Sequence, residues 1–462
     1  MIEFTPHEYQ KRGYDFIQNV PHCMLAFDMG LGKTVTTLYA LNELINDFAV
    51  NKVLVIAPLY VAKDTWPREV KKWSFAQNLR MSVICGSAEE REAALKAEAD
   101  IYVINRENTK WLVYTLGDKW PFDCVVIDES SSFKSHSSER FRALKLVVRE
   151  GLIKRLILLT GTPRPRSIED LWSQMFLIDQ GQRMGKTLTA FRTKYEMPGR
   201  RNGHIIYDWK ITPEAEEEVY QKLGDVIMSM RAEDWLEVPP VTYIDHDLSF
   251  DDKTAKKYKK FTKEKVLELE DETIAATSAG TLVGKLLQFT SGAVYTDITT
   301  HEYEVVHDVK LDATVEIVES TEEPVMIFYY FKSDYIRLQN ALRKYNPRTI
   351  QSPKDIEDWN AGKIRVLLAQ PQSMGHGLNL QEGPGRTIIW FTPIWDLEIT
   401  QQAEARLHRQ GQKRAVQIHR LIMNGTVDCD VIKALDKKET GQNALLEFVN
   451  AKKKEVHDEI QD

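Results

Sequence analysis

Short apolar runs alternate with longer amphipathic stretches along the first third of the chain. Each run ends in a polar residue or a Gly/Pro turn, as a buried strand does, and the six runs are HCMLAF, KVLVIAP, MSVICG, DIYVIN, DCVVIDE and RLILLTGTP. Helical patterns fill the intervals between them. Continuous apolar strands with helices between them predict a parallel sheet that is covered on both faces.

The strand pattern stops near residue 165 and resumes in PVMIFYYF, IRVLLAQ, RTIIWFTP and AVQIHRLI. Between these two series the chain reads as helical, first basic and then acidic, with EVPPVTY as a stiff crossover. We therefore expect an α/β protein with two parallel-sheet lobes and a helical insertion. The predicted parts are a first lobe over 1–235, a crossover and helical insertion over 236–305, a second lobe over 306–450 and a charged tail over 451–462.

Composition narrows the class of protein. A chain of 462 residues is too long for one core. No apolar run approaches the roughly 18 residues that span a bilayer, and the charged N-terminus does not resemble a signal peptide. The four cysteines form no C-x-x-C pair, which argues against a zinc site or a disulfide framework. We expect no membrane partner and a cytoplasmic location, or a nuclear one only in a eukaryotic host.

The charge is unevenly distributed. The net charge is −7, yet residues 183–201 and 401–420 each hold five or more basic side chains against a single glutamate. Such segregation permits a basic groove on an acidic body.

The tripeptide Gly-Lys-Thr occurs twice, and its context separates the two copies. Gly30-Leu31-Gly32-Lys33-Thr34 follows a buried strand and precedes a helix. Backbone N–H groups at a helix N-terminus, a lysine and a Mg²⁺-binding hydroxyl together bind phosphate, so we predict a phosphate loop here. The second copy, Gly185-Lys186-Thr187, has no long strand before it. We interpret it as an ordinary turn.

Carboxylates follow the fifth apolar run. Asp128 and Glu129 come directly after the strand CVVI, and Asp28 precedes the phosphate loop. Hydrolysis of a γ-phosphate requires a carboxylate that holds Mg²⁺ and a group that orients water. In a parallel sheet these residues meet at the carboxyl ends of the strands.

With these residues in place, the chain resembles the Swi/Snf family of helicase-like DNA translocases in superfamily 2, over nearly its whole length. FTPHEYQ is similar to the adenine-reading Q motif, with Gln10 as its glutamine. The remaining matches, in chain order, are DMGLGKT (phosphate loop), VIAPLYVAKDTWPREVKKW (motif Ia), VVIDES (motif II), LLTGTP (motif III), MRAEDWLEVPP (crossover), SMGHGLNLQ (motif V) and QQAEARLHRQGQKR (motif VI).

The resemblance implies two RecA-like lobes, with ATP in the cleft between them and DNA across both. Lys33 would hold the β- and γ-phosphates, Thr34 and Asp128 would hold Mg²⁺, and Glu129 would position the attacking water. Arg406 and Arg409 match the motif VI arginines that reach the γ-phosphate. The full set of predicted ATP-binding residues is Gln10, Gly30, Gly32, Lys33, Thr34, Gly377 and Gln402.

DNA contacts are predicted at strand ends and in the helicase-like motifs. The candidates for DNA binding or coupling are Thr65, Trp66, Asn105, Arg106, Thr160, Gly161, Thr162, Asn379, Gln381 and Trp395. For Trp66 and Trp395 a place in the core is an equal alternative. A translocase tracks the phosphates of duplex DNA without reading bases. We expect double-stranded DNA as the partner, a monomer, and recruitment by an unknown protein.

Two departures from the family pattern stand out. Ser131 occupies the place of the usual motif II histidine, and His376 lies between the motif V glycines. From the resemblance we expect a motor of the minimal bacterial or viral type. Two alternatives remain open at this point: a strand-separating helicase or restriction-type motor, and a nucleotide-gated DNA-binding protein without turnover.

Overall fold

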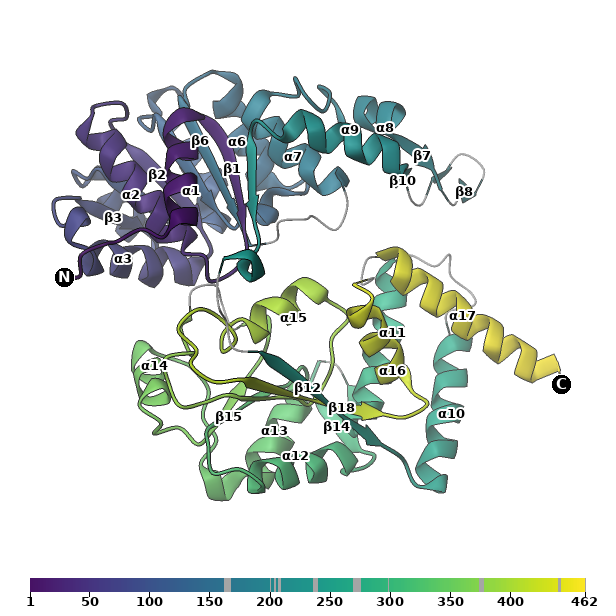
Figure 1. Ribbon diagram of the computed structural model, residues 1–462. Helices are drawn as coiled ribbons and strands as arrows, with labels where there is room; N and C mark the ends of the chain where they lie inside the picture. Colours follow the sequence, from purple (N-terminus) through teal and green to yellow (C-terminus); the bar gives the residue numbers. More distant parts are fainter. Residues whose placement is uncertain are drawn as a thin grey trace. The chain divides into compact units, whose positions relative to one another are not determined.

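The protein was analysed as a computed structural model (Figure 1). The structure describes residues 1–161, 168–199, 201–202, 205–206, 209–235, 240–268, 276–297, 299–373, 378–438 and 442–461. The chain divides at residue 236 into two compact units, called unit 1 before this point and unit 2 after it. Among the described residues no helix is long and apolar enough to cross a membrane.

Unit 1 is built on a seven-stranded sheet whose strands all run parallel. In spatial order the strands are β11 (Ile227–Met230), β1 (His22–Phe27), β6 (Arg155–Thr160), β5 (Cys124–Asp128), β2 (Val53–Ala57), β4 (Ile101–Asn105) and β3 (Met81–Ile84). All six strands predicted for the first third of the chain are present. The predicted fold class, α/β with parallel sheets, is confirmed.

Helices cover both faces of this sheet, because successive residues of each strand point to opposite sides. On one face Leu25 packs in a cluster with α1 (Glu8–Asn19), α2 (Lys33–Asn46) and α3 (Trp66–Lys72). On the other, Met24 and Ala26 pack with α5 (Thr109–Leu116), α6 (Glu139–Arg149) and α7 (Ile168–Asp179). The same cluster includes buried residues of α8 (Leu188–Tyr195) and α9 (Pro213–Leu223), and α4 (Ala88–Lys96) packs against it.

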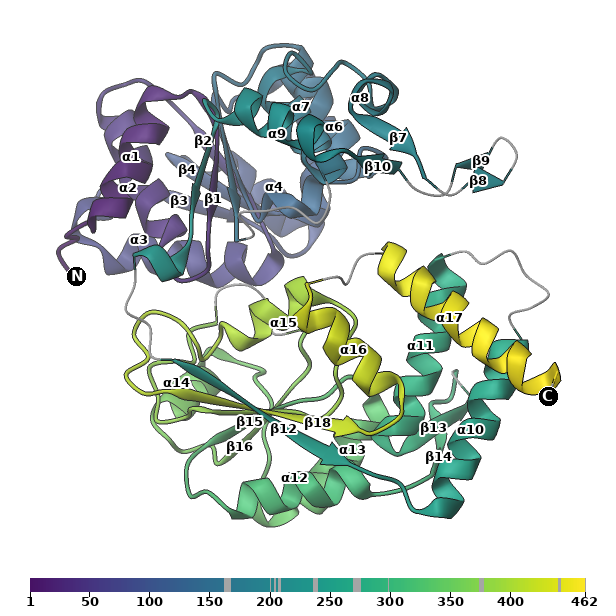
Figure 2. The same ribbon diagram turned by 45° about the vertical axis from the view of Figure 1, so that its right-hand side comes forward.

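Unit 2 has a smaller parallel sheet of five strands (Figure 2). Their order is β12 (Val241–Leu248), β18 (Val416–Met423), β17 (Thr387–Trp390), β15 (Val325–Phe328) and β16 (Val366–Ala369). The connecting helices are α12 (Val309–Glu319), α13 (Lys332–Ala341), α14 (Pro353–Asn360), α15 (Leu397–Glu404) and α16 (Val427–Asp436). The four strands predicted for the second series are all in this sheet.

The interval read as purely helical also contains strands, so that prediction was wrong in part. β11 adds to the unit 1 sheet beside β1, and β12 pairs with β18 over eight residues. Short antiparallel pairs follow: β7 (Glu196–Pro198) with β10 (Trp209–Ile211), β8 (Arg201–Asn202) with β9 (Ile205–Ile206), and β13 (Ala293–Asp297) with β14 (Glu302–Val305). β12 is an edge strand with alternating exposure, so it lacks the continuous apolar run by which the other strands were predicted.

A helical group completes unit 2. It consists of α10 (Asp252–Leu267), α11 (Ala276–Ser291), α16 and α17 (Gln442–Gln461), which share one apolar core. The predicted charged tail is the second half of α17.

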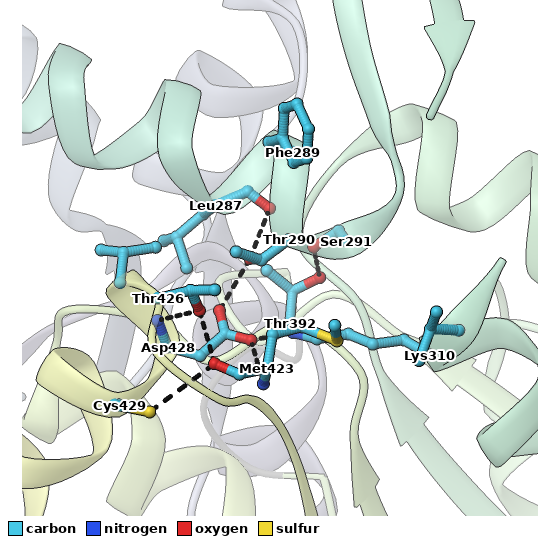
Figure 3. Close-up of polar contacts among 12 residues, drawn as sticks. Leu287, Phe289, Thr290, Ser291, Lys310, Thr392, Met423, Thr426, Asp428 and Cys429 are labelled. Carbon is cyan, nitrogen blue, oxygen red and sulfur yellow. Dashed lines mark hydrogen bonds and ion pairs between the residues drawn. The ribbon is translucent and has the colours of Figure 1, made fainter. Parts of the chain in front are cut away.

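A fully buried ion pair ties this group to the sheet (Figure 3). Lys310 of α12 lies 2.6 Å from Asp428 of α16, and neither side chain is exposed. The carboxylate of Asp428 also accepts hydrogen bonds from the Thr290 hydroxyl (2.7 Å) and the Met423 amide (3.0 Å). One carboxylate therefore joins α11, α12, α16 and the end of β18.

Candidate nucleotide-binding site

The predicted phosphate loop joins β1 to α2, and two of its glycines hold left-handed backbone conformations. Gly30 has φ 89° and Gly32, which precedes the first turn of α2, has φ 68°. A Cβ on Gly32 would lie 2.6 Å from Nε2 of Gln10. Position 32 therefore requires glycine for both backbone and space. The loop brings the N-terminus of α2, whose first amides point out of the helix, to the carboxyl end of β1.

Lys33 and Thr34 begin this helix. Nζ of Lys33 donates to the main-chain oxygens of Phe27 at 2.7 Å and Asp28 at 3.3 Å. The ammonium group is thus held inside the loop. Thr34 is half-buried in the first turn of α2. A cation and a hydroxyl at a helix N-terminus are the groups that bind a phosphate and its Mg²⁺.

Gln10 lies against the same loop. Its side chain is 5% exposed, and its Oε1 accepts a hydrogen bond from the amide of His7 at 2.9 Å. The neighbouring Tyr9 ring stacks on the His7 imidazole, with the ring centroids 5.4 Å apart. The start of α1 therefore packs on the glycine that precedes α2, and the predicted adenine-reading role of Gln10 stays a prediction.

Asp128 and Glu129 follow at the carboxyl end of β5. Glu129 is buried and has φ 61°, a left-handed conformation that strains a residue with a Cβ. Ser131, which replaces the usual histidine, donates its hydroxyl hydrogen to Oε1 of Glu129 at 3.0 Å. Ser130 donates to the buried Gln174 of α7 at 2.7 Å. Ser131 thus fixes the Glu129 carboxylate, and Ser130 fixes the turn after β5 to α7.

Trp66 contacts the same motif, which the sequence did not reveal. Its indole Nε1 donates to Oδ2 of Asp128 at 2.9 Å, and its side chain has no exposed surface. This burial agrees with the alternative in which Trp66 belongs to the core, and its role in DNA binding or coupling stays a prediction. The contact connects motif Ia to motif II. The π-helical turn Val61–Thr65, a rare element found mostly at functional sites, directly precedes Trp66.

Motif III, at the end of β6, lies against the phosphate loop. A Cβ on Gly161 would lie 3.3 Å from the Met29 side chain and 3.8 Å from Nζ of Lys33. Thr160 is buried at the end of β6, and Thr162 lies outside the described residues. β1, β6 and β5 are neighbours in the sheet, so their carboxyl ends bring the phosphate loop, motif II and motif III together.

The donors at these strand ends fit Mg²⁺. They are a carboxylate, Asp128, and a hydroxyl, Thr34, and both are hard oxygen ligands. Mg²⁺ commonly takes one or two protein oxygens and completes its octahedron with water and substrate phosphates. No larger protein cage is needed.

The predicted arginines belong to unit 2. Arg406 is 5% exposed, and Arg409 donates to Oδ1 of Asn379 at 2.9 Å. Asn379 in turn accepts at its main-chain oxygen from Asn360 at 2.9 Å. Motif VI is therefore bonded to motif V within one unit. Gln402 lies on α15 and donates to Glu398 at 3.4 Å, while Gly377 and His376 lie outside the described residues.

The remaining DNA candidates have mixed surroundings. Asn105 and Gln381 are both 7% exposed, and Asn105 binds Glu107 and Asn108 through its side chain. Arg106 is partly exposed and pairs with Glu107 at 3.0 Å. Thr65 is half-buried. Trp395 is half-buried against Phe448 of α17, with ring centroids 5.5 Å apart. Their roles toward DNA stay predictions.

The second Gly-Lys-Thr has a structural role. The Thr187 hydroxyl caps α8 by accepting from the amide of Ala190 at 3.1 Å, and the Gly185 oxygen accepts from the Trp172 indole at 3.0 Å. Lys186 is exposed, and a helix rather than a strand precedes this turn. This copy is an ordinary capping turn.

Glu404 is a further residue that the sequence did not single out. It ends α15 and accepts from the Tyr243 hydroxyl at 2.9 Å and the Trp390 indole at 3.0 Å. Burial raises its pKa to about 7. One face of α15, with β12, β17 and α16, lines a pocket of about 250 Å³ at this carboxyl group. The helix α15, which precedes Arg406 and Arg409, therefore ends in a carboxyl group that titrates near neutral pH.

In the fold, a glycine-containing loop joins a strand of a parallel sheet to the N-terminus of α2, which is the arrangement expected of a nucleotide-binding protein. The SNF2-related domain family matches residues 9–291, more than half of the chain, and the chain belongs to this family.

Its relatives include a phage protein that is matched over its whole length. Putative protein p41 of Acyrthosiphon pisum secondary endosymbiont phage 1 is 36% identical over 98% of this chain and 100% of the phage protein. The uncharacterized ATP-dependent helicase MG018 of Mycoplasma genitalium is 24% identical over 98% of this chain. The match covers only 43% of the length of that helicase. Among solved structures, the Sulfolobus solfataricus SWI2/SNF2 ATPase core in complex with dsDNA aligns over 99% of this chain and 95% of that chain, at 23% identity and a TM-score of 0.45.

Proposed function

We propose that this SNF2-related protein is a DNA-dependent ATPase that translocates on double-stranded DNA. Hydrolysis would be coupled to closure of the two units and to remodelling of DNA or of protein–DNA complexes. The observation that carries the proposal is that Lys33 follows β1 and that Asp128 and Glu129 lie at the end of β5, two strands that flank β6 in one parallel sheet, with Lys33 opening α2. A binding protein without turnover has no need of a strained, hydrogen-bonded Glu129 at this place.

Each residue has a separate task in this proposal. Lys33 binds the β- and γ-phosphates, and the amides at the start of α2 bind the same phosphates. Thr34 and Asp128 hold Mg²⁺, which when bound neutralises charge on the phosphates. Glu129 orients the attacking water, and the Ser131 hydroxyl holds its carboxylate in position.

Arg406 and Arg409 supply the coupling. They belong to unit 2, whereas the phosphate loop belongs to unit 1. If DNA brings the units into the closed arrangement, the guanidinium groups complete the site only on DNA, and hydrolysis becomes DNA-dependent. Arginine fingers are worth about 10³–10⁵ in rate where this role has been measured.

The partner in this proposal is duplex DNA, bound through its phosphates. The protein acts as a monomer in the cytoplasm of a bacterial or virus-infected cell, and an unknown protein recruits it.

The test is an ATPase assay that compares no nucleic acid, single-stranded DNA, duplex DNA, forked DNA and RNA. We expect strong stimulation by duplex DNA. We also expect displacement of a third strand from a triplex without separation of the duplex. Unwinding of the fork would indicate a strand-separating helicase instead, and nucleotide binding without turnover on any nucleic acid would contradict the motor proposal.

A further inference from the structure

Helix α10 of unit 2 is strongly basic. Its sixteen residues, DKTAKKYKKFTKEKVL, contain seven lysines against Asp252 and Glu264. The two basic segments noted in the sequence, 183–201 and 401–420, do not include it. None of the helicase-like motifs includes it either.

The helix is amphipathic, and its basic side chains gather on the outer face. Thr254, Tyr258 and Val266 are buried in the core of the helical group. Residues spaced three and four apart share a face of a helix, so four lysines lie together on the side away from this core. These four, called the lysine stripe, are Lys253, Lys256, Lys260 and Lys263.

The charges of the lysine stripe are hardly compensated. Among the described residues only Lys260 has a carboxylate within 4.0 Å, that of Glu264 at 3.8 Å. Lysines elsewhere are paired more closely, as Lys110 with Glu139 at 2.6 Å and Lys344 with Glu319 at 2.5 Å. Like charges at i,i+3 and i,i+4 destabilise a helix. Repulsion among these lysines therefore weakly disfavours the helix, although Asp251 lies near Lys253, and a bound anion would relieve the repulsion.

The base of α10 is firmly held. The Asp251 carboxylate caps the helix by accepting from the amide of Thr254 at 2.7 Å. The Tyr258 hydroxyl accepts from the amide of Val427, the first residue of α16, at 3.1 Å. α10 also packs beside α11 and α17 (Figure 2). The lysines therefore extend from a fixed surface, which lowers the entropic cost of binding an extended ligand.

The geometry points to the phosphate backbone of duplex DNA as the ligand. Lys253 and Lys263 are ten residues apart, about 15 Å along a helix. One DNA strand places a phosphate about every 3.4 Å of axis, so this length can face several phosphates. A local stripe of four cations on a chain of net charge −7 favours a polyanion over a small ligand.

We propose that the lysine stripe is a second DNA contact, which holds the duplex to unit 2 and is separate from the helicase-like motifs. This inference rests on the proposed function, because the duplex has to be the track of the motor. It assigns the stripe to holding DNA, not to hydrolysis.

The test compares two variants of equal charge. The stripe variant carries Lys253→Gln, Lys256→Gln and Lys260→Gln. The control variant carries Lys344→Gln, Lys354→Gln and Lys363→Gln, three exposed lysines elsewhere in unit 2. Glutamine is a good helix former, so α10 should remain intact, which circular dichroism and thermal unfolding check. The affinity for a labelled duplex is measured by fluorescence anisotropy at several NaCl concentrations.

We expect the affinity of the stripe variant for duplex DNA to fall at least tenfold near 0.1 M salt. The slope of log K against log [salt] should become less steep by about two to three, since each lost phosphate contact contributes about 0.9. The DNA concentration for half-maximal ATPase should rise, while kcat at saturating DNA should stay within twofold. The control variant should match the wild type.

An unchanged affinity and salt slope in the stripe variant would overturn the inference, and the stripe would then suit an acidic protein partner or solvent. Equal losses in both variants would overturn it too, because net charge alone would explain them. Failure of the proposed function looks different, since the wild type itself would then show no stimulation by DNA.

Discussion

Glu129 is buried, strained and hydrogen-bonded at the end of β5, which suits a residue that orients water. Its φ of 61° is unfavourable for a residue with a side chain, and the Ser131 hydroxyl holds its carboxylate. Glu129→Gln keeps shape and volume but removes the charge. We expect this variant to bind ATP with wild-type affinity and to lose at least about a hundredfold in DNA-stimulated kcat. Nucleotide titration and steady-state ATPase measure the two quantities.

A matched control uses the second Gly-Lys-Thr. Alanine at both Lys186 and Thr187 should leave ATP affinity and turnover unchanged, because this turn only caps α8. If the Glu129→Gln protein turned over at the wild-type rate, the water-orienting role would have to be abandoned.

The indole of Trp66 positions a carboxylate that we expect to bind Mg²⁺. Its Nε1 donates to Asp128 at 2.9 Å from a fully buried side chain. Trp66→Phe keeps an aromatic ring but removes the donor. A hydrogen bond to a charged group is worth about 1.5–3 kcal/mol, and we expect the Mg²⁺ concentration for half-maximal binding of ADP to rise severalfold, measured by calorimetry. The half-maximal Mg²⁺ for ATPase should rise in parallel.

Trp73 provides the control for this variant. It makes the same type of contact, from its indole to Glu69 at 2.5 Å, but at the end of α3 away from the phosphate loop. Trp73→Phe should leave the Mg²⁺ requirement unchanged even if it lowers the thermal stability. If the wild type and Trp66→Phe required the same Mg²⁺ concentration, the hydrogen bond from Trp66 to Asp128 would have a structural role only.

At the scale of elements, the Lys310–Asp428 pair holds three helices and the end of a strand together. Both side chains are fully buried, so removal of one partner leaves an uncompensated charge in the core. We expect Lys310→Met to lower the free energy of unfolding by about 3–5 kcal/mol. The double variant with Asp428→Asn should recover part of this loss. Urea denaturation measures both, and additive effects of the two substitutions would contradict a direct coupling.

Glu404 makes the packing of α15 pH-dependent. Burial raises its folded-state pKa to about 7 from an ordinary 4.5, so between these values the folded state binds more protons than the unfolded chain. Its contribution to stability is therefore full below about pH 4.5 and is lost as the pH rises through 7. In Glu404→Gln the amide can still bond to Tyr243 and Trp390, but it does not titrate.

The expected result is a stability difference that changes with pH. Relative to the wild type, Glu404→Gln should gain up to about 3 kcal/mol between pH 4.5 and 8, at 1.36 kcal/mol per pKa unit. Chemical denaturation at several pH values checks this, and parallel curves for the two proteins would mean that the carboxyl group titrates normally.

The same elements show how far the sequence could predict the structure. The phosphate loop was predictable because its glycines, lysine and flanking strand are local features. β12 was not predictable, because it is an edge strand in which partly buried and exposed residues are mixed and charged residues interrupt the apolar ones. It is recognised as a strand only by its pairing with β18. The contact of Trp66 with Asp128 joins residues 62 apart, and that of Arg409 with Asn379 joins residues 30 apart. Such contacts depend on packing that no short pattern encodes, whereas the strand ends where they meet follow from the parallel sheet.

At the scale of the whole molecule, the nucleotide site and the arginines belong to different compact units. If, as proposed, the phosphate loop of unit 1 supplies most of the ATP binding, then ATP binding and ATP hydrolysis are separable properties of the chain. The lysine stripe would hold DNA to unit 2, and motif Ia would contact it from unit 1. In the proposed function, DNA that engages both units would trigger their closure.

Substitution of Arg409 tests directly whether ATP binding and ATP hydrolysis are separable. We expect Arg409→Ala to lower DNA-stimulated kcat by about 10³-fold, as for other arginine fingers, while ATP affinity changes by less than tenfold, because the loop of unit 1 supplies most of the binding. The guanidinium also donates to Asn379, so Asn379→Ala is the necessary control: it removes this contact and leaves the charge. A loss of turnover in Asn379→Ala as large as that in Arg409→Ala would assign the effect to motif V, through its contact with Arg409 or its predicted role toward DNA, and not to a finger role of the arginine. If ATP affinity fell as far as turnover in Arg409→Ala, the arginine would belong to ground-state binding, and closure of the units would not be the step that makes hydrolysis depend on DNA.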